Sequence, residues 1–172
     1  SRRDDRRRSN GIDGARMKTR LTDDLKAWIG REATYTAPEE LGRASIRYFA
    51  LALGDDNPIY SDSAFAGKTV HGDVIAPPTF VCETNQIINQ KADENGYIGH
   101  HWPLPLSSGR FIRGGNDYEM MQPVRPSDRV TVTWKILDIY ERPTRKLGTL
   151  VFVVSEARYA NQRGELLAVN RE

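Results

Sequence analysis

The sequence predicts one α+β domain, in which a curved antiparallel β-sheet wraps around one long helix. Its 172 residues, 38% of them hydrophobic, suit a single domain with a sizeable core. Helical patterns lie before residue 96, and strand-like alternation separated by turns fills residues 116–169. Helices followed by an antiparallel meander indicate an α+β fold. The sequence contains no internal repeat and no apparent interior domain boundary.

The N-terminal half is predicted to supply two helices and a strand. Residues 21–29 have amphipathic helical spacing, and residues 32–36 alternate as a short strand. A capping box with an early proline at residues 36–39 predicts a helix over 39–53 that ends at Gly54 in a left-handed C-cap. Apolar side chains cover most of the circumference of this helix, so its second half should be buried on more than one side.

A long connection and a central helix follow. Residues 54–72 show little secondary structure in their pattern, and because so long a connection is usually functional, we expect it to cover a pocket. Residues 74–80 lead to a Pro-Pro helix start, and a helix with one apolar face is predicted over about 78–95. Residues 100–115 are interpreted as an irregular connection with room for a short strand around 110–112.

The remainder is predicted to be β-structure. Alternating, β-branched residues mark strands at 116–121, 128–141, 149–159 and 165–169, with turns at 142–145 and 161–164.

Positive charge is concentrated at the N-terminus. Residues 1–20 hold eight bases and three acids, so 17 of the 25 bases and 20 of the 23 acids remain, a net charge of −3 for the rest of the chain. A nucleic-acid-binding domain is normally basic on its folded part, so we expect no nucleic-acid partner. Residues 1–20 are interpreted as a disordered basic arm or as residues left from cloning, and residues 21–172 as the folded domain.

The sequence gives no indication of a metal, a cofactor or a membrane. Cys82 is the single cysteine and Cys or His clusters are absent, so we expect no metal and no resident cofactor. Cys82 itself is interpreted as a small apolar core residue. No apolar run approaches the roughly 18 residues that span a bilayer, and the charged N-terminus lacks the apolar region of a secretory signal. We therefore predict a cytoplasmic protein without membrane contact.

The most specific feature is an apolar helix that runs into an acidic loop, although such a loop is also ordinary turn chemistry. Three stretches of the sequence together form a specific pattern. They are Tyr-Phe-Ala-Leu-Ala-Leu-Gly-Asp-Asp-Asn-Pro-Ile-Tyr at 48–60, Ile-Ala-Pro-Pro-Thr-Phe at 75–80, and Gly-Asn-Asp-Tyr-Glu at 115–119 with Val-Arg-Pro-Ser-Asp at 124–128. Through them, residues 21–170 resemble the MaoC-like hydratases and dehydratases of hotdog fold. They are most similar to the FAS1-like dehydratase, or MaoC N-terminal-type, branch. The resemblance implies a single hotdog domain.

In that family the loop signature is Gly-Asp-x-Asn-Pro-aliphatic-His, and the chemistry is the reversible addition of water to a trans-2-enoyl thioester. A carboxylate and an imidazole on one loop deprotonate the water and supply a proton to the α-carbon. The resemblance puts Asp55 at the carboxylate position and Asn57 at the asparagine position, but Tyr60 at the histidine position. A phenol, with an ordinary pKa of about 10, is a poor replacement for an imidazole with one of about 6.5.

A second departure lies at the start of the predicted central helix. Catalytic members have Ala-His-Gly there, and the glycine N–H polarises the thioester carbonyl. This chain has Ala76, Pro77 and Pro78, and proline has no N–H to donate. Because loss of one such donor lowers the rate roughly 100- to 1,000-fold, we expect little catalysis by this chain alone.

The resemblance therefore predicts the non-catalytic, substrate-accommodating half of a two-hotdog hydratase or dehydratase. Its partners would be an acyl-CoA or acyl-carrier-protein thioester and a catalytic MaoC-like hotdog subunit or a second copy, because joining two sheets removes an exposed edge. The acyl chain is expected beside the central helix, held mainly by apolar burial, near Asn57, Ile75, Pro78, Thr79, Phe80 and Val81. Plain core packing is the alternative interpretation for the residues beside the helix.

Two other functions stay open. One is a self-sufficient (R)-specific hydratase that uses Asp55, with Tyr60 in support. The other is a hotdog module that retains acyl thioesters without chemistry.

Further side chains each have a functional and a structural interpretation. His71, on the loop before the helix, is the best-placed replacement imidazole, whereas His100 and His101 are interpreted as ordinary surface or packing histidines. Three cationic side chains are candidates for CoA phosphates, with a solvated loop as the alternative: Lys68, Arg110 and Arg113.

Overall fold

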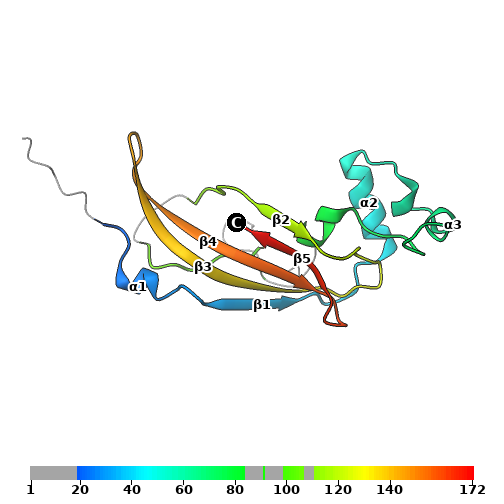
Figure 1. Ribbon diagram of the computed structural model, residues 1–172, viewed down its shortest axis with the longest axis horizontal. Helices are drawn as coiled ribbons and strands as arrows, with labels where there is room; N and C mark the ends of the chain where they lie inside the picture. Colours follow the sequence, from blue (N-terminus) through cyan, green and yellow to red (C-terminus); the bar gives the residue numbers. More distant parts are fainter. Residues whose placement is uncertain (1–18, 84–90, 92–98, 107–110) are drawn as a thin grey trace, which may run out of the picture.

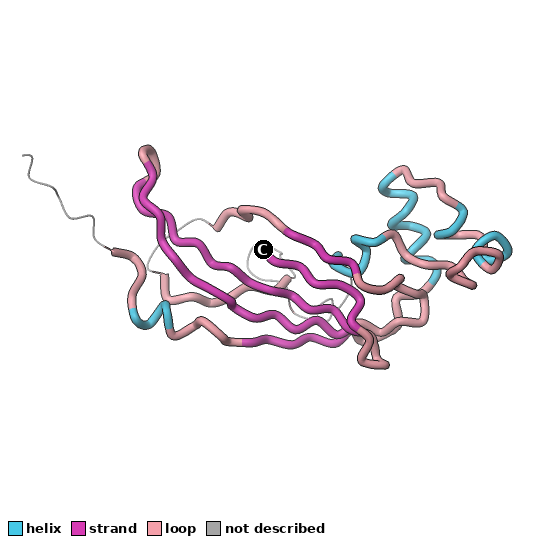
Figure 2. The backbone as a smooth tube through the Cα atoms, viewed as in Figure 1, coloured by secondary structure: helices cyan, strands magenta, loops and turns pink. Residues whose placement is uncertain are grey.

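The computed structural model describes residues 19–83, 91, 99–106 and 111–172. Within them a long antiparallel sheet runs through the molecule, and most of the helical segments gather at one end of it (Figures 1 and 2). The chain thus has the α+β composition that the sequence predicts. No helix in these ranges is long and apolar enough to cross a membrane.

The sheet has five strands in the order β1-β3-β4-β5-β2, and all neighbouring pairs are antiparallel. The strands are β1 (Glu32–Thr36), β2 (Asp117–Met120), β3 (Thr131–Thr144), β4 (Gly148–Ala160) and β5 (Leu166–Arg171). The order leaves β1 and β2 as the two edges of the sheet.

The predicted strands are confirmed in position, and the expected turn at 161–164 is present. The expected turn at 142–145 is wrong in its bounds, because β3 and β4 remain paired as far as Thr144 and Gly148. Pro143 therefore lies inside β3, opposite Thr149. The tight turn is possible because Gly148 adopts a φ of 70°, which side chains disfavour.

The start of α2 (Arg43–Leu53) differs from the prediction. The capping box at 36–39 starts no helix, because residues 37–42 bond to the chain that enters β3. The N–H groups of Ala37 and Leu41 donate to the carbonyls of Val130 (2.8 Å) and Asp128 (3.0 Å). The Thr36 hydroxyl meets Thr131 Oγ1 at 2.9 Å across the sheet instead of capping a helix.

The burial predicted for α2 is also wrong in this single chain. Ile46 and Ala50 face the core, whereas Tyr48, Leu51 and Leu53 are 63%, 63% and 58% exposed. The helix packs on one side, and its opposite apolar face is open.

The remaining helices are short. α1 (Asp23–Lys26) covers less than the predicted 21–29. The connection 54–72 contains two helical turns that the sequence pattern did not reveal, η1 (Pro58–Tyr60) and α3 (Ser63–Ala66).

The predicted central helix begins as η2 (Pro78–Glu83), and its continuation to residue 95 lies mostly outside the described residues. Phe111 and Ile112 form no strand, and Arg110, the third residue of that expected strand, also lies outside them.

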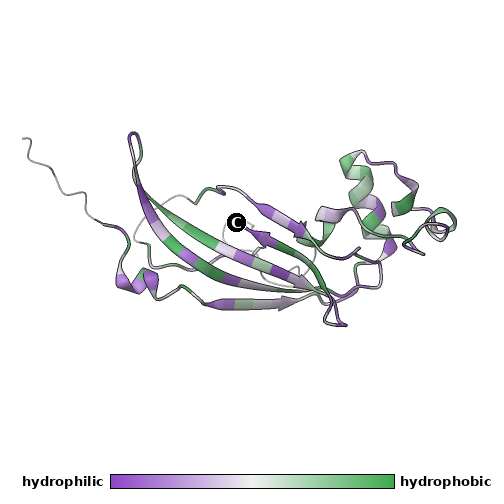
Figure 3. Cartoon of the chain, viewed as in Figure 1, coloured by the Kyte–Doolittle hydropathy of each residue, from purple (hydrophilic) through white to green (hydrophobic). Residues whose placement is uncertain are grey.

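The two faces of the sheet differ in polarity, as the striping of the strands in Figure 3 indicates. On β3 the inner face carries Val132, Trp134 and Ile136, and the outer face carries Thr131, Thr133 and Lys135. The outer face is held by polar pairs, including Thr34 with Thr133 (3.1 Å) and Lys135 with Glu32 (3.0 Å).

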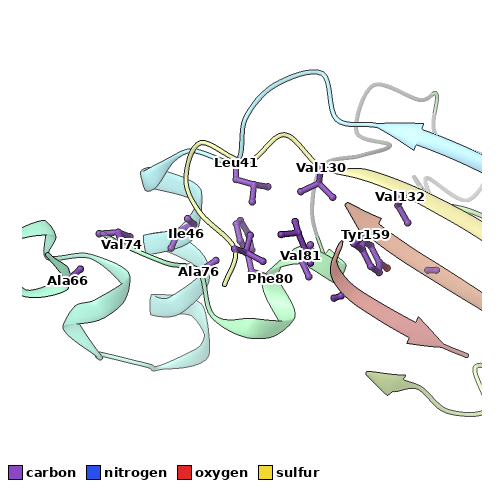
Figure 4. Close-up of a cluster of buried hydrophobic side chains, with 14 residues drawn as sticks. Leu41, Ile46, Ala66, Val74, Ala76, Phe80, Val81, Val130, Val132 and Tyr159 are labelled. Carbon is purple, nitrogen blue, oxygen red and sulfur yellow. The ribbon is translucent and has the colours of Figure 1, made fainter. Parts of the chain in front are cut away.

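Buried side chains form two clusters on the inner face. The main cluster lies where α2 and η2 meet the sheet (Figure 4), and its members are Leu41, Ile46, Ala66, Val74, Ala76, Phe80, Val81, Val124, Val130, Val132, Ala157, Tyr159, Leu167 and Ala168. The second cluster, farther along the sheet, consists of Leu25, Ile136 and Ile139, with Trp28, Trp102, Leu104 and Leu106 among the side chains packed on it.

Candidate functional site

The acidic loop begins where α2 ends. Gly54 closes the helix with φ 71° and ψ 22°, as predicted, and the N–H of Asp55 donates to Ala50 O at 2.9 Å. Asp55 Oδ1 accepts from the N–H of Asn57 at 3.1 Å, and Asn57 Oδ1 accepts from the N–H of Ile59 at 3.1 Å. These side chains stabilise successive tight turns, and both residues are exposed.

Tyr60 follows on the same loop as the last residue of η1. Its ring is half-buried and packs against the main cluster. Burial raises the pKa of the phenol above its ordinary value, and the nearby Asp55 carboxylate raises it further. At neutral pH Tyr60 is therefore a protonated phenol.

An ion pair fixes the rest of the loop to α2. The Arg43 guanidinium donates to both oxygens of Asp73 (2.9 and 2.8 Å) and to Ser63 Oγ (2.9 Å). The hydrogen bond from Arg43 holds the pKa of the Asp73 carboxyl below its usual value, with help from the N–H of Val74. The sequence did not reveal this contact, because Arg43 looks like a solvent-facing helix residue and its partner lies thirty positions away.

The second motif stretch lies beside the loop. The N–H of Ile75 donates to Ile59 O at 3.4 Å, and the N–H of Ala76 to Val124 O at 2.8 Å. Pro77 is buried and Pro78 is exposed at the start of η2. The structure thus joins the acidic loop to the Ala-Pro-Pro segment, and neither proline of that segment offers an N–H.

The proposed acyl-contacting residues divide into two groups. Phe80 and Val81 are 7% and 0% exposed in the main cluster (Figure 4), and the Phe80 ring packs on Phe49 with centroids 5.0 Å apart. Pro78 and Thr79 are exposed, and Ile75 is half-buried. Their role in substrate binding stays a prediction, as do the catalytic roles of Asp55 and Tyr60 and the binding role of Asn57.

The three histidines occupy different environments. His71 is half-buried at the end of the loop, where its backbone carbonyl accepts from Arg125 at 3.0 Å. His100 is a packing histidine, stacked on Trp134 (4.8 Å between centroids) and edge-on to Trp102 (4.3 Å). Burial lowers the pKa of His100 to about 4, and neighbouring His101, which is exposed, adds to this.

The other candidates show no convergence on the acidic loop. Lys68 is exposed, and Arg113 lies 3.8 Å from the Glu172 carboxylate. Cys82 packs against the main cluster, in agreement with its predicted core position. Among the described residues, no group of three or more His, Cys, Asp or Glu side chains is arranged to hold a metal ion.

Comparison with known families identifies the domain. The FAS1-like, dehydratase domain region matches residues 27–170. This chain belongs to the FAS1-like dehydratase family. The resemblance to the MaoC-like hydratases and dehydratases is thereby confirmed.

Relatives of this FAS1-like domain include curated bacterial proteins. A UPF0336 protein of Streptomyces coelicolor is 44% identical over 105 residues, 61% of this chain and 66% of that protein. A probable enoyl-CoA hydratase alpha subunit of Thermomonospora curvata is 27% identical over 165 residues, 86% of this chain. The alignment covers 49% of that subunit, so this chain spans about half of it.

Solved structures show the same fold. The ChsH1-ChsH2 complex from Mycobacterium tuberculosis matches with a TM-score of 0.65 at 19% identity, covering 86% of this chain and 83% of that chain. A MaoC-like dehydratase from Rhodospirillum rubrum matches with a TM-score of 0.59 at 23% identity, covering 83% of this chain and 87% of that chain. The predicted hotdog fold is confirmed.

Proposed function

We propose that this FAS1-like domain is the non-catalytic, substrate-accommodating half of a two-hotdog enzyme that hydrates enoyl thioesters or dehydrates 3-hydroxyacyl thioesters. The observation that carries the proposal is the half-buried, protonated Tyr60 at the histidine position of the signature loop. The substrate would be an acyl-CoA or an acyl-carrier-protein thioester, and we propose the cytoplasm as its location.

The chemistry of Tyr60 argues against independent turnover. A group that takes a proton from water at neutral pH works best with a pKa near that pH. The pKa of Tyr60 is raised from an ordinary value that is already about 10, so its phenolate is scarce. Asp55 keeps a carboxylate in the loop but has no imidazole beside it in the signature turn.

The Ala-Pro-Pro segment supports the same conclusion. Developing negative charge on a thioester oxygen needs donors aimed at it, and backbone N–H groups usually supply them. Pro78 stands where the family glycine would donate, and it has no N–H. A catalytic partner would supply both missing groups.

The edge strand β2 offers a place for that partner. Among the described residues β2 pairs with β5 alone, and exposed apolar side chains lie at its C-terminal end and in the segment before it. They are Phe111, Ile112, Met120 and Met121, exposed by 71%, 78%, 38% and 38%. An apolar unpaired edge favours pairing with another sheet. The structurally similar ChsH1-ChsH2 assembly is a complex of two different proteins.

The deciding experiment compares the chain alone with the chain plus a hotdog protein that carries Gly-Asp-x-Asn-Pro-x-His and Ala-His-Gly. We expect no hydration of crotonyl-CoA by the chain alone, co-purification of the two proteins, and turnover by the pair. In the pair, replacing the partner's signature histidine should abolish turnover, whereas Asp55→Asn in this chain should leave most of it. Turnover by this chain alone that is lost in Asp55→Asn would overturn the proposal.

That last outcome would identify a self-sufficient (R)-specific hydratase. The exposed Asp55 carboxylate on an otherwise complete signature turn is the observation that favours this second candidate. Tight acyl-CoA binding without turnover in any combination would instead indicate a binding module.

A further inference from the structure

Polar side chains interrupt the apolar inner face of the sheet between the two clusters. We call them the polar band: His100, Ser155, Asn170 and Glu172. Apolar residues of both clusters adjoin the band: Ala157 of the main cluster is paired with Asn170, and Ile136 of the second cluster is paired with Ser155. An elongated apolar ligand that follows the inner face would cross this band.

The strand register puts the members of the band on one face. Ser155 of β4 and Glu172, the residue after β5, exchange backbone hydrogen bonds of 2.8 and 2.9 Å, so they stand opposite each other. Asn170 stands opposite Ala157, two residues along both strands, and therefore on the same face. His100 reaches this face from the connection 99–106 by stacking on Trp134, which is paired with Ala157.

Some polar groups of the band have partners. The indole N–H of Trp102 donates to Ser155 Oγ at 3.0 Å, Tyr35 Oη meets His100 Nδ1 at 3.0 Å, and Asn170 Nδ2 donates to Asn116 Oδ1 at 3.2 Å. These contacts fix the orientation of the side chains. They do not involve His100 Nε2 or Asn170 Oδ1.

Three buried atoms of the band have no hydrogen-bond partner among the described residues: His100 Nε2, Asn170 Oδ1 and Glu172 Oε2. Asn170 is only 3% exposed. The Arg113 guanidinium, 3.8 Å from Glu172 Oε2, is too distant for a hydrogen bond. Buried polar atoms are normally paired, and each unpaired one weakens the fold unless something satisfies it.

The unpaired acceptor atoms of the band indicate a ligand that donates a hydrogen bond. Asn170 lies in β5 and Glu172 directly follows this strand, and Asn170 Oδ1 and Glu172 Oε2 can each accept a hydrogen bond that no described residue donates. A metal ion is a poor candidate, because one carboxylate and one amide are too few ligands and no metal-binding group exists in the part of the chain described. A neutral O–H group on a largely apolar chain fits both the acceptors and their apolar surroundings.

We propose that the polar band binds a hydroxyl group in the distal half of the acyl chain, away from the thioester, so that this chain selects acyl thioesters with a distal hydroxyl over those without one. The hydroxyl donates to Asn170 or Glu172 while the rest of the acyl chain packs on the two apolar clusters. This inference rests on the proposed function, and it adds a substrate class to it.

The test measures binding of the purified full chain to saturated acyl-CoAs of increasing length, each plain and with one hydroxyl in the distal half of the chain. Fluorescence of Trp102 and Trp134 reports the binding, with calorimetry as a second readout. For the lengths that reach the band, we expect the hydroxylated form to bind about tenfold more tightly, the usual contribution of one good hydrogen bond.

Two variants locate the effect. Asn170→Leu should remove the preference for the hydroxylated chain over the plain chain of the same length. Glu172→Gln should reduce the preference, whereas Glu156→Gln, the same change beside Ser155 but on the outer face with Arg158 and Arg171, should not alter it. Thermal unfolding of each variant verifies that it is folded.

The outcomes separate the two proposals. Equal affinity for plain and hydroxylated chains at every length means that water satisfies the band, and it overturns this inference while the proposed function stands. A preference that survives both Asn170→Leu and Glu172→Gln overturns it as well. No binding of any acyl-CoA, alone or with the catalytic partner, contradicts the proposed function itself.

Discussion

At the scale of single residues, Tyr60 decides between a catalytic and a supporting role. We expect Tyr60→Phe to change the turnover of the proposed two-hotdog assembly by less than about twofold, because a phenol that stays protonated contributes little as a base. The ring remains packed on the main cluster, so the fold should be kept. The measurement is kcat for crotonyl-CoA at neutral pH. A loss of about a hundredfold or more would assign proton transfer to Tyr60.

His100 makes stability depend on pH. Its pKa falls from 6.5 to about 4 on folding, so the unfolded chain binds more protons than the folded chain between these values. The stabilising contribution of the neutral imidazole is complete above pH 6.5 and is lost as the pH falls toward 4.

We therefore expect His100→Phe to reduce the loss of stability on acidification while keeping the aromatic packing. Urea unfolding at neutral pH and at a pH midway between the two pKa values measures this. His101→Asn is the control. Because His101 is exposed, this variant should keep most of the pH dependence of the free energy of unfolding. An unchanged pH dependence in His100→Phe would contradict the assignment.

At the scale of elements, the end of α2 depends on one glycine. Gly54 has a φ of 71° and nothing lies within 4 Å of an added Cβ, so the effect of an alanine comes from the backbone alone. We expect Gly54→Ala to lower the free energy of unfolding by about 1 kcal/mol. Urea denaturation provides the measurement.

Gly114→Ala is the matched control, since Gly114 is equally open but has no left-handed φ. We expect it to be neutral or slightly stabilising. Equal losses in both variants would contradict the backbone explanation.

Local sequence patterns predicted some elements well and others poorly. β1 and the Gly54 cap follow from alternation and from the freedom of glycine, and both were predicted correctly. The start of α2 was predicted wrongly because Thr36 and Ala37 bond to residues near 130, and no local pattern contains that information. η1 and α3 were missed because they depend on side-chain caps from Asn57 and Asp62 within a polar loop.

At the scale of the whole molecule, the contacts that shape the candidate site join distant parts of the chain. The signature turn was recognisable as a motif, but its attachment through Arg43 and Asp73 was not. The polar band likewise arises only when the end of β5, the centre of β4 and the connection at 99–106 share one face. The spacing of these residues in the sequence does not predict that they share one face, because each member of the polar band looks like an ordinary strand or loop residue.

In the part of the chain that the structure describes, the sheet has the edge strands β1 and β2 and α2 has an open face, and a partner would cover such surfaces. We expect Met120→Lys to weaken association with the catalytic hotdog, or with a second copy, by about tenfold or more, because a lysine on an edge strand opposes sheet pairing. The stability of the single chain should change by less than about 0.5 kcal/mol, since Met120 is 38% exposed.

Leu147→Lys is the matched control for this prediction. Leu147 is 70% exposed in the β3–β4 turn, at the far end of the sheet from the α2 end (Figure 1), and the change adds the same charge. Analytical ultracentrifugation of each variant, with and without the partner, measures the association. Because both lysines add equal charge, weakening by Met120→Lys alone would locate the interface at β2, whereas equal weakening by both would indicate a charge effect without a specific edge. Full association in Met120→Lys would exclude β2 and point to the exposed face of α2 with Tyr48 and Leu51 as the surface to mutate next.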